Sequence, residues 1–249
     1  MSLPFAPRTL MRLAKEARVG AARPVVLGGA RELQGALARG LAAGGSQSLV
    51  RENGGVEGAA VLVWLGEPDE DRLRAAFRAR VPIIAVTEAD SVPYVLDTSI
   101  VRVERGSGLP VEAVAAKIAH ILGDDGAALG AALPVLREPV LDEMIRRASV
   151  RNATIAAAVW IPGVDFPILT LNQLRLVLRI AGVYGHEVGT ALLPEAAGVV
   201  GAAYGFRAAA RRITSVVRVG TFATRGAVAF AGTRAVGEAA RRRFAIDPK

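Results

Sequence analysis

The sequence predicts an α/β domain with a small parallel sheet, followed by an all-helical domain of four or five helices. In the first half, short runs of apolar residues alternate with segments of helical periodicity. In the second half these runs stop, and alanine and glycine become frequent. Uniformly apolar strands that alternate with helices are typical of βαβ units in a parallel sheet. The 249 residues, 52% of them hydrophobic, are enough for two cores.

Four apolar runs in the first half predict the strands of the sheet. Each run precedes a segment with one apolar helical face. In the first of these helices, Leu33, Leu37 and Leu41 are expected to face the core because of their four-residue spacing. The strands are expected over 24–28, 59–65, 82–86 and 98–103, and the helices over 31–43, 69–80 and 111–122.

The second half is expected to be entirely helical. Gly185 marks the end of one helix, and Gly220 marks a break in the last one. Helices are expected over 141–150, 171–184, 188–210 and 214–244. The predicted organisation is an amphipathic basic segment (1–23), the α/β domain (24–126), the helical domain (134–244) and a short tail (245–249).

Two features of the chain suggest helix surfaces with a special role. The N-terminal segment carries Arg8, Arg12 and Lys15 among apolar residues, so it either lies on anionic lipid or covers its own domain. Alanine recurs at every fourth residue from Ala223 to Ala239, a spacing that lets helix backbones approach closely in membranes and also occurs in soluble bundles.

The net charge of +8 belongs to the second half of the chain. Up to Gly130 there are fifteen basic and fifteen acidic side chains, whereas from Ala131 onward there are sixteen and eight. This asymmetry predicts an anionic partner, either a lipid surface or a protein, and a homo-oligomer is a further alternative. A nucleic acid is not expected, because no recognised motif and few aromatic residues accompany the basic region. The anionic surface is expected to contact a stripe of Arg207, Arg211, Arg218 and Arg225, for which a solvated face is the alternative.

No catalytic constellation, metal site or cofactor follows from the sequence. Cysteine is absent, and the two histidines, His120 and His186, have no neighbours at metal-ligand spacing. The chain is therefore not expected to be an enzyme that depends on a metal or a prosthetic group.

The turn after the third apolar run reads Thr87-Glu-Ala-Asp90, and a Gly-Ser-Gly turn follows the fourth run. This order resembles the second half of a Ras-like GTPase of the translation-factor class, in which Asn/Thr-Lys-x-Asp reads the guanine base. The resemblance implies residual nucleotide binding at Thr87 and Asp90. Glu88 stands where the family has Lys, so the charge at this position is reversed.

The phosphate loop of such a GTPase is missing. It requires Gly-x-x-x-x-Gly-Lys-Ser/Thr, because backbone N–H groups cradle the phosphates while the lysine and the hydroxyl hold the terminal phosphate and magnesium. The chain has Gly28-Gly-Ala-Arg-Glu-Leu-Gln-Gly35 instead. Gly28 and Gly29 are expected to keep at most a residual anion site at a helix N-terminus, with plain turn geometry as the alternative. The first domain is thus predicted to be a pseudo-GTPase.

Several stretches of the second half resemble the YcjF-like family of bacterial proteins (domain-of-unknown-function family 697), which often accompanies GTPase-like domains. The main stretch is Leu171-Asn-Gln-Leu-Arg-Leu-Val-Leu-Arg-Ile-Ala-Gly-Val-Tyr-Gly185, and 161–165 and 233–237 also fit. The resemblance covers about 134–244 and implies no catalytic residues.

These observations favour a non-catalytic pseudo-GTPase scaffold in the cytoplasm, associated with a membrane surface or a protein partner through its basic helical domain. Two alternatives stay open. One is a divergent nucleotide-binding hydrolase that uses Gly28 and Asp90. The other is an integral protein of the inner membrane with a helical hairpin, since the windows 152–174 and 188–206 each hold a single carboxylate.

Overall fold

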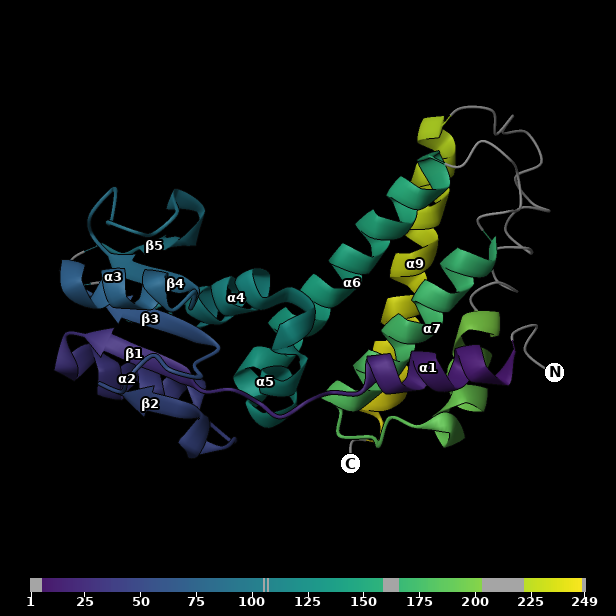
Figure 1. Cartoon of the computed structure of the whole chain (residues 1–249), viewed down its shortest axis with the longest axis horizontal. Helices are drawn as coiled ribbons and strands as arrows, with labels where there is room; N and C mark the ends of the chain where they lie inside the picture. Colours follow the sequence, from purple (N-terminus) through teal and green to yellow (C-terminus); the bar gives the residue numbers. More distant parts are fainter. Residues whose placement is uncertain (1–5, 105, 107, 159–165, 203–221, 248–249) are drawn as a thin grey trace. The chain divides into compact units, whose positions relative to one another are not determined.

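The computed structural model describes residues 6–104, 106, 108–158, 166–202 and 222–247 (Figure 1). The chain divides into two compact units. One is an α/β unit, Gly20–Glu143. The other is a helical unit that combines Met1–Val19 with Met144–Lys249.

A five-stranded, all-parallel sheet forms the centre of the α/β unit (Figure 1). Its order is β2-β1-β3-β4-β5, so the chain leaves β1 for one neighbour and then crosses to the other side. In doubly wound sheets, the point between β1 and β3 where the strand order reverses is the usual place for a ligand. The strands are β1 (Val25–Gly29), β2 (Val50–Glu52), β3 (Val61–Leu65), β4 (Ile83–Thr87) and β5 (Ile100–Arg102).

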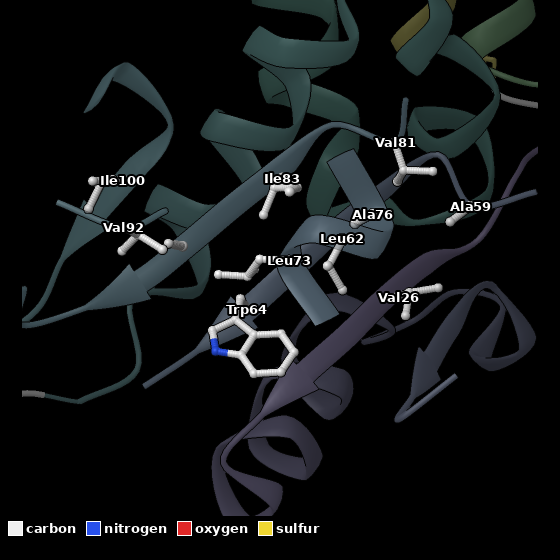
Figure 2. Packing of buried hydrophobic residues seen from close by; sticks show 11 residues of the cluster. Val26, Ala59, Leu62, Trp64, Leu73, Ala76, Val81, Ile83, Val92 and Ile100 are labelled. Atoms are coloured by element: carbon white, nitrogen blue, oxygen red, sulfur yellow. The ribbon is translucent and has the colours of Figure 1, made fainter. Parts of the chain in front are cut away.

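Helices cover both faces of this sheet. Contacts of α2 with β1, of α4 with β4, and of α2 with α4 place α2 and α4 on one face. On the other face, Leu73 and Ala76 of α3 pack with Leu62, Trp64 and Ile83 of the strands (Figure 2). The helices are α2 (Arg31–Leu41), α3 (Glu70–Arg78), α4 (Val111–Leu122), α5 (Ala127–Ala132) and the first part of α6 (Pro134–Ala158); single 3-10 turns occupy Gln47–Leu49, Asp97–Ser99 and Gly123–Gly126.

The four expected strands all form, with bounds that differ by one or two residues. The strand β2 was not expected, because it has only three residues and two of them are exposed at the edge of the sheet. Of the three leucines predicted to face the core from α2, Leu37 and Leu41 are buried, and only the prediction for Leu33 is wrong. Leu33 is 40% exposed, whereas Gln34 is fully buried together with Leu37 and Leu41.

The helical unit is built around α7 (Phe166–Val183). Most of its residues from Gln173 onward are buried, and it contacts both α1 and α9. A helix buried on nearly every side is typical of the centre of a bundle. Around it lie α1 (Pro7–Ala17), the second part of α6, a 3-10 turn at Thr190–Leu192, helical backbone over 193–202, and α9 (Phe222–Ala245).

Helix α1 packs on α7, far away in the sequence (Figure 1). Its apolar face, with Leu13, Ala14 and Ala17, is buried. A side-chain hydrogen bond and ion pair join Arg175 of α7 to Glu16. Of the two roles expected for the N-terminal segment, the structure therefore shows a helix that covers protein. The protein that it covers is the helical unit.

Helix α6 is longer than expected. It begins at Pro134, continues through Pro139 and ends at Ala158, whereas the sequence predicted a helix over 141–150. Val140 lies against Gly126 and Gly130 of the α/β unit, where an added Cβ would come within 3.3 Å and 3.2 Å of its side chain. The division between the units consequently falls inside this helix, after Glu143, and not in the stretch 126–134.

Glycines give α9 its close approach to α6. A Cβ at Gly237 would lie 2.7 Å from Cγ1 of Ile145, and one at Gly226 would lie 3.3 Å from the carbonyl oxygen of Ala153. By contrast, Ala227 and the other described alanines of the four-residue repeat are exposed or half-buried. Within the described part of the helical unit, the alanine repeat therefore does not form the face by which α9 packs on α6.

A buried polar cluster joins α6, α7 and α9. The hydroxyl of Thr233 accepts hydrogen bonds from Nδ2 of Asn152 at 2.9 Å and from Nε2 of Gln173 at 3.2 Å. The side-chain oxygen of Asn152 accepts a third bond, 2.9 Å long, from Asn172. Because Asn152, Gln173 and Thr233 are almost fully buried, the two bonds to the Thr233 hydroxyl replace hydrogen bonds that Nδ2 of Asn152 and Nε2 of Gln173 would otherwise make with solvent.

Within the described residues, no helix combines the length and the apolar composition that crossing a bilayer requires. Both windows considered for a helical hairpin, 152–174 and 188–206, include residues that lie outside the described part of the chain.

Candidate functional site

The carboxyl ends of β1, β3 and β4 form the edge where a doubly wound sheet holds its ligand. Gly28 and Gly29 end β1, and Thr87 ends β4. Two clefts open at this edge, one at the end of β1 beside β3 and one at the ends of β3, β4 and β5.

The connection from β1 to α2 leaves no room for a phosphate loop. Gly29 still pairs with Leu65 of β3, and α2 begins at Arg31, so Ala30 alone joins the two elements. The N–H of Ala30 donates to the carbonyl oxygen of Leu65 at 2.9 Å. A phosphate loop instead has several residues between strand and helix, whose N–H groups point at the ligand.

Packing within the protein explains why positions 28 and 29 are glycines. A Cβ at Gly28 would lie 2.6 Å from Cε3 and Cζ3 of Trp64, whose indole packs at this point and donates from Nε1 to the carbonyl of Glu67 at 2.7 Å. Gly29 has φ +92, and a Cβ there would lie 2.0 Å from the carbonyl oxygen of Leu65. The close approach that permits only glycine is therefore made by the neighbouring strand.

Gln34 stands where the phosphate-loop pattern has its lysine. It is completely buried, and its Nε2 donates to the carbonyl of Gly29 at 2.8 Å and to Oδ1 of Asn53 at 3.0 Å. Its Oε1 accepts the N–H of Asn53 at 3.0 Å. One side-chain amide thus ties α2 to the ends of β1 and β2. The sequence reasoning missed this residue, although its spacing of three and seven residues from Leu37 and Leu41 marks it as inward-facing.

The cleft at the switch point has a volume of 660 Å³ and walls of mixed charge. Its lining includes two arginines, Arg31 and Arg72, and two carboxylates, Glu67 and Asp69. The carboxylate of Asp69 also caps α3, accepting from the N–H groups of Asp71 and Arg72 at 3.1 Å each. Equal numbers of basic and acidic side chains give little attraction for a polyphosphate.

The second cleft, of 460 Å³, lies at the ends of β3, β4 and β5 and has acidic walls. Its described lining includes Glu67, Glu88 and Glu104 and contains neither lysine nor arginine. Thr87 and Leu33 also line it. The place where the GTPase resemblance puts a nucleotide base is therefore surrounded by carboxylates.

The structure separates Thr87 from Asp90. Thr87 is buried, and its hydroxyl accepts from the N–H of Ala89 at 3.2 Å. The Asp90 side chain is 98% exposed and lies 3.5 Å from Nε of Arg102, which also donates from Nη2 to the Asp90 carbonyl at 3.2 Å. Gly29 and Thr87 line the two neighbouring clefts, whose described walls share Glu67, whereas Asp90 lines neither.

Of the predicted arginine stripe, Arg207, Arg211 and Arg218 lie outside the described residues. Arg225 lies in the first turn of α9 and is half-buried. The described parts of the chain also contain no group of three or more side chains suited to hold a metal ion.

No family model, curated protein or solved structure matches this chain.

Proposed function

We propose that this protein is a non-catalytic scaffold, in which a pseudo-GTPase unit is joined to a YcjF-like helical unit that contacts an anionic surface. The first part of this proposal rests on the protein's own hydrogen bonds at the place where a GTPase has its phosphate loop. The side-chain amide of Gln34, which stands in place of the lysine, donates hydrogen bonds to Gly29 and Asn53. The N–H of Ala30 donates to β3. Both groups that would have to turn toward a phosphate are thereby engaged within the protein.

The electrostatics of the clefts support the same conclusion. A nucleoside triphosphate carries several negative charges, which protein sites balance with lysine, arginine and magnesium. In the described walls of the acidic cleft, the only charged side chains are carboxylates. The described walls of the switch-point cleft contain as many carboxylates as arginines. The alternative is a divergent GTPase-like site that hydrolyses a nucleotide. Nucleotide binding in the following titration would favour this alternative.

Isothermal titration of the full chain with GTP, GDP and ATP, each with magnesium at millimolar concentration, is expected to give only heats of dilution. The reason is the engaged amide of Gln34 together with the missing loop. Saturable heat with any of the three nucleotides would contradict the scaffold proposal, and release of phosphate in the same mixture would establish the hydrolase.

The charge distribution carries the second part of the proposal. The second half of the chain holds sixteen basic and eight acidic side chains, and the first half is balanced. Each basic side chain near an anionic membrane contributes about 1 kcal/mol of binding. We propose anionic lipid as the partner of the stripe that begins at Arg207, on the cytoplasmic side of a membrane.

Sedimentation with phosphatidylserine-containing vesicles is expected to pellet the protein, and vesicles of phosphatidylcholine alone are expected to leave it in solution. Reversal of three charges, Arg207→Glu, Arg211→Glu and Arg218→Glu, should weaken binding by at least about a hundredfold, because each variant loses an attraction and adds a repulsion. Arg23→Glu, Arg39→Glu and Arg51→Glu in the α/β unit make a control with the same net charge. Equal recovery in the supernatant with both vesicle types would leave an acidic protein as the partner and refute the lipid.

A further inference from the structure

A third hollow of the α/β unit lies away from the carboxyl edge, at the start of β4 and the ends of α3 and α4. Its volume is 780 Å³. Three of its wall residues are large apolar or aromatic side chains left in solvent: Phe77 is 59% exposed, Tyr94 is 38% exposed and Leu96 is 74% exposed. We call this hollow, with its walls of Phe77, Arg78, Arg80, Tyr94, Leu96 and His120, the α3 groove.

The aromatic wall of the α3 groove is held in place by its neighbours. The rings of Phe77 and Tyr94 lie 5.5 Å apart between centroids. Nε of Arg74 donates to the Tyr94 hydroxyl at 2.9 Å, and its guanidinium lies 5.8 Å from the centre of that ring. The hydrogen bonds with Tyr94 and then Glu70 raise the pKa of Arg74, so this brace stays charged. A platform fixed before binding loses little conformational entropy when a partner covers it.

Two residues of the α3 groove have unusual backbone. Arg80 has φ +55 and Tyr94 has φ +63, in the left-handed region that costs a non-glycine residue about 1 kcal/mol or more. Only one other non-glycine residue in the described chain, Asn53, has a positive φ. At Arg80 this backbone closes α3, because the N–H of Val81 donates to the carbonyl oxygen of Ala76 at 3.0 Å in the usual C-terminal cap of a helix. The turn directs the chain from α3 into β4 beside the groove.

The rim of the groove is basic. Arg78 and Arg80 line it, and within the described residues neither guanidinium has a hydrogen-bond or ion-pair partner. The described lining contains no aspartate or glutamate. His120 also lines the groove, and its Nδ1 lies 3.4 Å from Oε1 of Glu143. A ligand complementary to these walls would have an apolar side chain with carboxylates beside it.

From these observations we infer that the α3 groove binds a segment of a partner protein, in which a large aliphatic or aromatic residue is flanked by aspartate or glutamate. The apolar residue enters between Phe77 and Leu96, and the carboxylates meet Arg78 and Arg80. A small molecule would remain largely in solvent against walls this exposed, whereas a protein segment covers them. A membrane takes up apolar side chains that protrude, while these line a hollow.

This inference can be tested by panning a phage-displayed library of random short peptides against the full chain. The enriched peptides are expected to combine Leu, Ile, Phe or Trp with at least one pair of acidic residues. The most enriched peptide, synthesised with a fluorescein label, is then titrated by fluorescence anisotropy. Phe77→Ser and Arg78→Glu are each expected to weaken its binding by about tenfold or more.

Two matched variants serve as controls. Leu33→Ser removes a comparably exposed apolar side chain, and Arg39→Glu reverses an exposed charge, both on α2. Both are expected to bind the peptide within about twofold of the parent chain, and urea unfolding of all four variants checks that they fold.

The inference is overturned by any of three results: no enrichment over the unselected library, enriched peptides without acidic residues, or affinities that Phe77→Ser and Arg78→Glu leave unchanged. It is also overturned if these two variants abolish binding to anionic vesicles while no peptide binds, because the partner is then a lipid surface. The α3 groove is separate from the two clefts of the carboxyl edge, so the outcome of the nucleotide titration does not affect this test.

Discussion

Gly29→Ala is expected to lower the free energy of unfolding by about 3–4 kcal/mol. The new Cβ would lie 2.0 Å from the carbonyl oxygen of Leu65, which is backbone of a central strand and cannot move aside cheaply. The left-handed backbone at φ +92 adds roughly 1–2 kcal/mol for any residue that has a Cβ. Urea unfolding followed by Trp64 fluorescence, in a Trp160→Phe background, measures the loss within the α/β unit.

Gly58→Ala is the matched control for this measurement. Gly58 has a similar φ of +71, but nothing lies within 4 Å of the added Cβ. Its cost should be about 1 kcal/mol, from backbone conformation alone. The difference between the two variants then isolates the collision with β3. Equal losses would show that the strand yields and that Gly29 is an ordinary turn glycine.

Thr233→Val should destabilise the helical unit by about 3 kcal/mol. Valine has nearly the shape of threonine but accepts no hydrogen bond, so Nδ2 of Asn152 and Nε2 of Gln173 each lose a partner in a buried place. A buried donor without a partner costs roughly 1–3 kcal/mol, and the extra apolar contact offsets only part of this cost. Urea unfolding followed by far-ultraviolet circular dichroism measures the change.

Thr154→Val provides the comparison on a helix surface. Thr154 is exposed, and its hydroxyl donates to the carbonyl oxygen of Val150 at 3.0 Å, on its own helix. Its replacement should change stability by no more than about 0.5 kcal/mol. If Thr233→Val were as mild as this control, the cluster around Asn152 would not hold the three helices together.

The sequence predicts the strands of the α/β unit well, because an apolar run buried on both faces depends little on its surroundings. It fails where a neighbour decides the outcome. Gln34 is buried because Gly29 and Asn53 satisfy its amide, and no periodicity announces those partners. The strand β2 is short and polar and acquires its conformation by pairing with β1.

The candidate site shows the same division. The missing lysine and hydroxyl of the phosphate loop are visible in the letters of the chain, since a motif is local. The hydrogen bonds that Gln34 makes at the position of the lysine are not visible there. Likewise, the amphipathic pattern of α1 shows which face is buried, through Leu13 and Ala17, but cannot say that α7 covers it.

The packing of α1 on α7 has a consequence for synthesis of the chain. Glu16 and Arg175 are 159 residues apart, and residues 20–143 between them form the other unit. On the ribosome, the α/β unit is complete and able to fold while α1 still has no partner. During that interval the apolar side chains of α1, Leu13, Ala14 and Ala17, have no protein surface to cover them, and an isolated helix of this length is only marginally stable in water.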